Sequence, residues 1–106
     1  MTKDQKPELV DELIDRGHNF SGPVLVSYYQ AMMERPDRTT LLSESTVPVL
    51  FIMGKEDQAV SPEDSLKQCH LPEKSYIHML QRSGHMGMWE EPEKSNSVLD
   101  EFLSQV

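Results

Sequence analysis

The sequence contains a single cysteine, Cys69, among its 106 residues. One cysteine excludes a disulfide within the chain and a cysteine-rich zinc site, and it gives no support to an oxidising compartment. No apolar run approaches the roughly 18 residues of a membrane-spanning helix. The first ten residues lack the apolar stretch of a signal peptide. We therefore expect a cytoplasmic protein that does not bind membranes.

Basic residues are also scarce. The chain has 10 lysines and arginines against 18 aspartates and glutamates, which gives a net charge of −8. Nucleic acids and anionic membranes are bound through basic patches, so we expect neither as a partner. The acidic excess is typical of a well-solvated surface.

The first part of the chain is rich in helical signals. The segment KPELVDELIDRGHN is predicted to be a helix, because its apolar residues Leu9, Val10, Leu13 and Ile14 fall on one face, with Pro7 in the first turn and Gly17 as the residue after the end. A second helix is predicted over residues 21–35, with Pro23 in its first turn. Both helices precede a short polar connector.

The composition then changes at residues 48–53, PVLFIM, in which Val49–Met53 are five consecutive apolar residues. A short, β-rich run that is apolar on both faces indicates a buried strand of a parallel sheet. A second strand is predicted at residues 75–79. The helix predicted between them, over residues 61–71, begins with Ser61 as N-cap, and a final helix opens at Pro92.

This order of elements predicts an α/β fold with two parallel strands, joined by a right-handed helical crossover and preceded by two helices. A two-stranded parallel sheet is rarely stable on its own. The first strand calls for further strands and helices that these 106 residues do not contain. The sequence thus reads as part of a larger α/β domain.

Two polar residues follow the predicted strands at the places where α/β sheets carry their functional groups. Asp57 follows the first strand and His85 the second, in a short loop flanked by Gly84 and Gly87. Adjacent parallel strands lie about 4.8 Å apart, so loops leaving the same edge can bring the two side chains together. A carboxylate on one imidazole nitrogen leaves the other nitrogen free to act as a general base.

The segments VPVLFIMGKEDQAVSPED and YIHMLQRSGHMGMWEEPEKSNSVLDEFL together resemble the C-terminal part of an α/β-hydrolase-fold protein of the serine esterase-like kind. In that family the triad acid follows the penultimate strand in a P-V-L-x-x-x-G-x-x-D context. The base sits in a G-H loop ahead of a helix that opens with E-x-P-E. The resemblance covers residues 47–106 and implies Asp57 as acid and His85 as base, acting on a small ester-like substrate without a cofactor.

Residues 1–46 resemble the helical cap of many family members. By that resemblance, apolar side chains of the second helix help to shape a substrate pocket, although ordinary helix packing is the alternative for each of them. The four side chains are Tyr28, Tyr29, Met32 and Met33.

The sequence departs from the family at the nucleophile. The family's serine lies upstream in a G-x-S-x-G motif, and none of the serines here has glycines at those two positions. The chain therefore carries an acid and a base without a visible nucleophile, and alone it is expected to be inactive. Two alternatives follow: a non-catalytic chain that folds as a homo-oligomer, or one that complements an upstream half.

Simpler interpretations of the same residues stay open. Asp57 could merely close the turn after its strand, with His85 as loop filler, and Glu56 is an alternative acid. The glutamates around Pro92 are predicted to stabilise the start of the final helix. The histidines and Cys69 lack the spacing of a metal site, so no metal is expected, and Cys69 is predicted to be buried on the helix between the strands.

Overall fold

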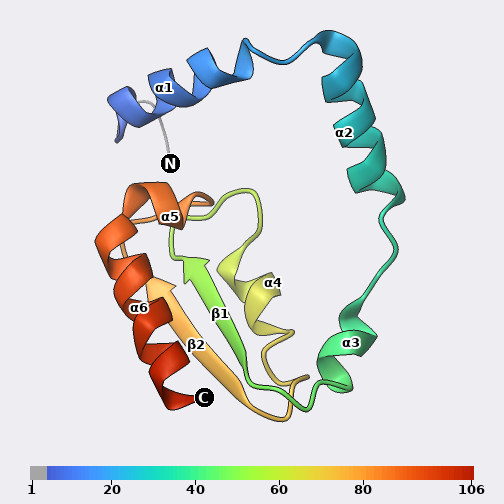
Figure 1. The fold of residues 1–106 in the computed structure, drawn as a ribbon, viewed down its shortest axis with the longest axis vertical. Helices are drawn as coiled ribbons and strands as arrows, with labels where there is room; N and C mark the ends of the chain where they lie inside the picture. The colour runs from blue at the N-terminus through green and yellow to red at the C-terminus, as the bar shows by residue number, and fades with distance from the viewer. Residues whose placement is uncertain (1–4) are drawn as a thin grey trace. The chain divides into compact units, whose positions relative to one another are not determined.

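The computed structural model describes residues 5–106, which divide into two compact units. The first unit ends at Arg38, and the second spans Thr39–Val106 (Figure 1). The sequence predicted a boundary between residues 46 and 47. Each unit is described by itself below.

The N-terminal unit consists of two helices, both at the predicted places. Helix α1 spans Pro7–Gly17 and α2 spans Gly22–Glu34, and each has a proline in its first turn. The Ser21 hydroxyl accepts a hydrogen bond from the Val24 N–H and so caps α2. Neither helix has a fully buried residue.

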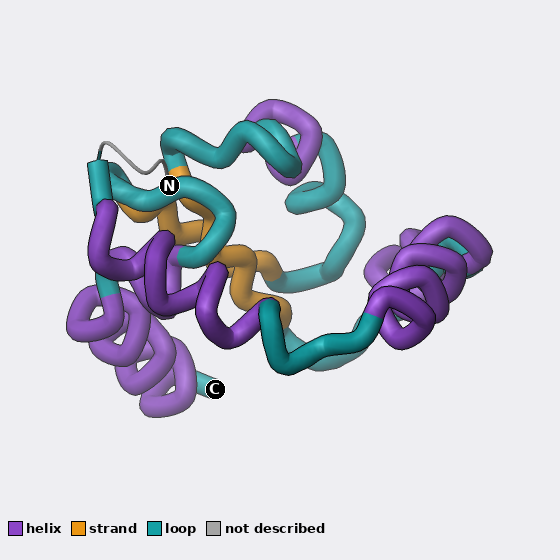
Figure 2. Tube along the Cα trace, turned by 90° about the horizontal axis from the view of Figure 1, so that it is seen from above, coloured by secondary structure: helices purple, strands orange, loops and turns teal. Residues whose placement is uncertain are grey.

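The C-terminal unit confirms the predicted α/β class. Strands β1, Val49–Gly54, and β2, Ser75–Leu80, pair in parallel, with Val49 opposite Ser75 and Gly54 opposite Leu80. Because the strands are parallel and in this register, their carboxyl ends lie at the same edge of the sheet. The loops that follow residues 54 and 80 therefore begin side by side, at the arrowheads of β1 and β2 in Figure 1, and Figure 2 shows the strands from above in orange.

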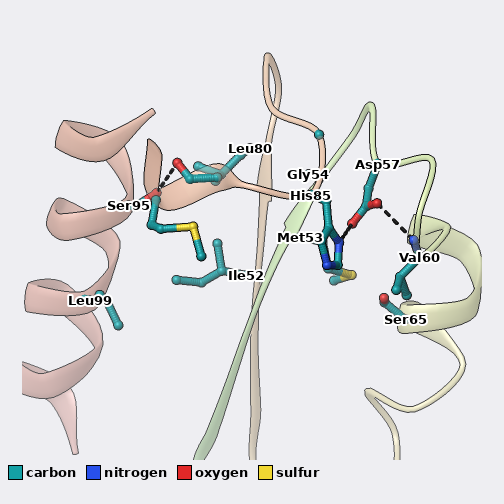
Figure 3. A pocket seen from close by; sticks show the side chains of 13 residues that line it. Ile52, Met53, Gly54, Asp57, Val60, Ser65, Leu80, His85, Ser95 and Leu99 are labelled. Atoms are coloured by element: carbon teal, nitrogen blue, oxygen red, sulfur yellow. Dashed lines mark hydrogen bonds and ion pairs between the residues drawn. The ribbon is translucent and has the colours of Figure 1, made fainter. Parts of the chain in front are cut away.

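Short and long helices flank the strand pair. Helix α3 spans Thr39–Ser43, α4 spans Pro62–Leu66, α5 spans Gly87–Glu90 and α6 spans Pro92–Gln105. Helices α4 and α6 lie on opposite sides of the strands (Figures 1 and 3). On the α6 side, the rings of Phe102 and Tyr76 meet edge to face with centroids 5.2 Å apart.

The core of the described residues is small. Its buried apolar side chains are Met53, Cys69, Leu80 and Val98, of which only Leu80 is fully buried. Residues Val49–Ile52 of β1 are only half-buried, although their sequence predicts burial on both faces. The reason is that residues 5–106 form a two-stranded sheet, so no third strand covers the free edge of β1.

The crossover between the strands is less helical than predicted. The Ser61 hydroxyl caps α4 by accepting from the Asp64 N–H, as expected, but α4 ends at Leu66. The chain continues in turns with hydrogen bonds from residue i to i−3 up to Leu71, and Pro72 excludes further helix. Cys69 is therefore buried as predicted, 7% exposed, but in a turn. The short helices α3 and α5 were not predicted.

Candidate active site

The loops after β1 and β2 are joined by backbone hydrogen bonds that extend the strand pairing. The Lys55 N–H donates to the Leu80 carbonyl, and the Glu56 N–H donates to the Ser83 carbonyl, both at 2.9 Å. Gly54 makes this approach possible, because a Cβ at this position would overlap the Gly84 carbonyl oxygen and lie 2.5 Å from that of Ser83. The two loops thus form one layer at the sheet edge.

Asp57 sits in a tight turn held by its own side chain. Its Oδ1 accepts hydrogen bonds from the N–H groups of Ala59, at 2.8 Å, and Val60, at 2.9 Å. Its Oδ2 lies 2.9 Å from Nδ1 of His85 (Figure 3). The turn therefore fixes the carboxylate while leaving one oxygen for the imidazole.

The exposures of the two side chains differ in a way that suits an acid–base pair. The Asp57 side chain is 12% exposed, whereas that of His85 is 56% exposed. With Nδ1 engaged by the carboxylate, Nε2 is directed away from Asp57. That nitrogen is the one available to exchange a proton with a reacting group.

Opposing effects act on the pKa of Asp57, and the net result is a lowered value. Burial acts to raise the pKa, but the hydrogen bonds from Val60, His85 and Ala59 favour the ionised form and together outweigh it. The carboxylate is therefore held charged beside the imidazole.

The lowered pKa of Asp57 predicts a pH dependence of stability. Its contribution is fully present above the unfolded pKa, near 3.9, and is lost as the pH falls through the lower folded pKa. The free energy of unfolding is expected to fall more steeply below about pH 4 in the wild type than in Asp57→Asn. Urea unfolding at pH 5 and pH 2.5 measures the difference, and equal losses in both proteins contradict the prediction.

A cavity of about 360 Å³ opens beside this pair (Figure 3). Its lining is mostly apolar and comes from both strands, their loops, α4, α5 and α6. The lining residues are Ile52, Met53, Gly54, Asp57, Val60, Ser65, Leu80, Gly84, His85, Gly87, Met88, Ser95 and Leu99. A mostly apolar cavity with the contact between Asp57 and His85 at its wall can hold an apolar molecule against His85.

The side chains predicted to shape a substrate pocket lie in α2 of the N-terminal unit. All of them are more than half exposed, and the lining of the cavity comes from the C-terminal unit alone. The Tyr28 ring meets that of Phe20 edge to face at 6.2 Å. A substrate-binding role for Tyr28, Tyr29, Met32 and Met33 stays a prediction.

Sequence reasoning missed two residues at the site, Glu90 and Glu91. It assigned their charges to a helix start, but their carboxylates accept hydrogen bonds from the loop that leads to His85. Ser83 is fully buried, and its hydroxyl donates to Glu91, so it is not a nucleophile facing the cavity. The signal that could have found the pair is Pro92, which interrupts the helix directly after two glutamates.

Within residues 5–106, no group of three or more histidine, cysteine, aspartate or glutamate side chains could hold a metal ion. No helix in this part of the chain is long and apolar enough to cross a membrane.

No protein-family model matches the chain. Among curated proteins, it is 39% identical over 70 residues to a proline iminopeptidase from Heyndrickxia coagulans, a match that covers 66% of this chain and 24% of the relative. It is 34% identical over 68 residues to a 2-hydroxy-6-oxononadienedioate/2-hydroxy-6-oxononatrienedioate hydrolase from Burkholderia vietnamiensis, covering 64% of this chain and 24% of the relative.

Among solved structures, the chain superimposes on a thermophilic esterase from Thermogutta terrifontis with a TM-score of 0.67 and 30% identity. That match covers 70% of this chain and 27% of the esterase. The chain therefore spans about a quarter of the length of these relatives. Their names describe different substrates, while the fold is shared.

Proposed function

Because the chain belongs to the α/β-hydrolase fold family, we propose that its C-terminal unit supplies the acid and the base of a Ser-His-Asp hydrolase. The observation that carries the proposal is the 2.9 Å contact between Asp57 Oδ2 and His85 Nδ1 at the wall of an apolar cavity. The serine would come from a polypeptide segment outside these 106 residues, since no G-x-S-x-G motif is present here.

The chemistry follows from this assignment. The serine hydroxyl attacks the carbonyl of an ester or similar acyl substrate while His85 Nε2 takes its proton. Asp57 keeps the imidazole in the tautomer that leaves Nε2 free and stabilises the imidazolium that forms. His85 then returns the proton to the leaving group.

The test is complementation. The 106-residue chain alone is expected to hydrolyse p-nitrophenyl acetate no faster than buffer. Mixed with the Thermogutta terrifontis esterase lacking the region that matches this chain, it is expected to restore hydrolysis, and His85→Ala is expected to abolish the gain. A mixture that binds tightly but stays inactive contradicts the catalytic proposal, as does turnover that His85→Ala leaves intact.

A second, non-catalytic function is favoured by the exposed apolar surface. The free edge of β1 and exposed residues such as Leu41, Val47 and Ile77 leave apolar groups in contact with water. A second copy of the chain could cover them by extending the sheet. The mass of the chain in solution, measured by light scattering without any partner, tests this function. The mass of a dimer supports the homo-oligomer, and the mass of a monomer at all concentrations contradicts it.

A further inference from the structure

The loop that precedes His85 is held by two consecutive glutamates, Glu90 and Glu91, here called the glutamate pair. Glu90 Oε2 accepts a hydrogen bond from the Gly84 N–H at 2.7 Å. Glu91 Oε2 accepts from the Arg82 N–H at 3.1 Å and from the Ser83 hydroxyl. Three successive residues directly before His85 are thus bonded to two carboxylates.

Both carboxylates are shielded from water, which strengthens their effect on the loop. Glu90 is 6% exposed as a residue, and the Glu91 side chain is 11% exposed. Hydrogen bonds to charged acceptors are stronger than neutral ones, and a buried N–H that loses its acceptor is costly. The loop therefore has one strongly preferred position.

The backbone explains how neighbouring glutamates reach the same loop. In a continuous helix, successive side chains point about 100° apart. Here α5 ends at Glu90 and Pro92 begins α6, which leaves Glu91 between them with φ −136° and ψ 63°. The break directs both carboxylates to the segment before His85. The Ser95 hydroxyl, on α6, also donates a hydrogen bond to the carbonyl of Gly87, two residues after His85.

The glutamate pair also acts on the loop of Asp57 through one residue. The Ser83 hydroxyl donates a hydrogen bond to Glu91. The Ser83 carbonyl accepts one from the Glu56 N–H at 2.9 Å. Glu56 immediately precedes Asp57. A displacement of Ser83 therefore moves the acid and the base relative to one another.

We propose that Glu90 and Glu91 are positioning residues that set the contact between His85 and Asp57. They do not reach the reacting atoms themselves; they fix the three residues directly before the base. A role of the two glutamates in catalysis rests on the function proposed above. Their effect on the contact between His85 and Asp57 can be measured without any enzyme activity.

The pKa of Asp57 reports the contact, because the hydrogen bond from His85 is one of the causes that lower it. In Glu90→Ala and Glu91→Ala, the Asp57 pKa measured by carboxyl NMR is expected to rise toward its value in His85→Ala. Glu91→Gln keeps an acceptor oxygen and is expected to restore most of the wild-type value. Glu93→Ala, which changes an exposed glutamate in the first turn of α6, is the matched control and is expected to change nothing.

The outcomes separate the two proposals. An unchanged Asp57 pKa in folded Glu90→Ala and Glu91→Ala overturns the positioning role, whatever the complemented activity. If these variants unfold, Ser83→Ala, which removes only one donor, replaces them: a raised Asp57 pKa supports the role and a wild-type value overturns it. If the pKa responds but complementation gives no activity, the proposed function fails and the positioning role stands.

Discussion

Replacing Asp57 by asparagine is expected to lower kcat of the complemented hydrolase by about 10⁴-fold. The reason lies in the hydrogen bonds of the turn. Oδ1 of Asp57 accepts two backbone N–H groups, from Ala59 and Val60, so an asparagine would place its oxygen there. Its NH₂ group would then face Nδ1 of His85 as a donor. His85 would have to carry its proton on Nε2, the nitrogen that should accept one.

The matched control is Glu56→Gln, which neutralises the neighbouring, exposed carboxylate. It is expected to change kcat by less than about twofold, since an exposed charge contributes little. The measurement is p-nitrophenyl acetate hydrolysis by the complemented protein at pH 7 to 8. Equal losses in both variants, or a larger loss in Glu56→Gln, would transfer the role of acid to Glu56.

Gly54→Ala is expected to destabilise the C-terminal unit by about 1–3 kcal/mol or more. The added methyl group would overlap the backbone of Ser83 and Gly84, and backbone cannot rotate away as a flexible side chain does. The loop carrying His85 must then move away from the loop carrying Asp57. The variant is therefore expected to lose stability and the contact between acid and base together.

Urea unfolding followed by the fluorescence of Trp89, the single tryptophan, reports on the C-terminal unit alone. Gly17→Ala is the control, because a Cβ there would meet nothing within 4 Å. It is expected to leave the Trp89 transition in place. A Gly54→Ala transition at the wild-type urea concentration would show that the two loops need not approach as closely as they do.

The strands and the contact between Asp57 and His85 could be predicted because their signals are local. An apolar run predicts β1, and parallel pairing of neighbouring strands brings the residues that follow them to one edge. These two facts bring Asp57 and His85 within possible reach of each other, and in the structure Asp57 Oδ2 lies 2.9 Å from His85 Nδ1. Ser61 and Pro92 likewise predict where α4 and α6 begin.

The features that could not be predicted depend on contacts between distant segments. The close approach at Gly54 exists only because the Gly84 loop folds over it, and a glycine after a strand has many other uses. The early end of α4 reflects turns that compete with helix before Pro72. Whether Glu91 stabilises a helix start or holds a loop depends on the backbone angles between α5 and α6.

The Ser83 carbonyl, which receives the Glu56 N–H, has a consequence for recombination between homologous genes. Exchanging the segment around His85 with that of a relative separates Ser83 from the Glu56 it contacts and from the Glu91 that binds its hydroxyl. A chimera in which residues 54–57, 80–87 and 90–91 come from one parent keeps both contacts. The crossover region 58–74, which joins the strands, can be replaced without separating these partners.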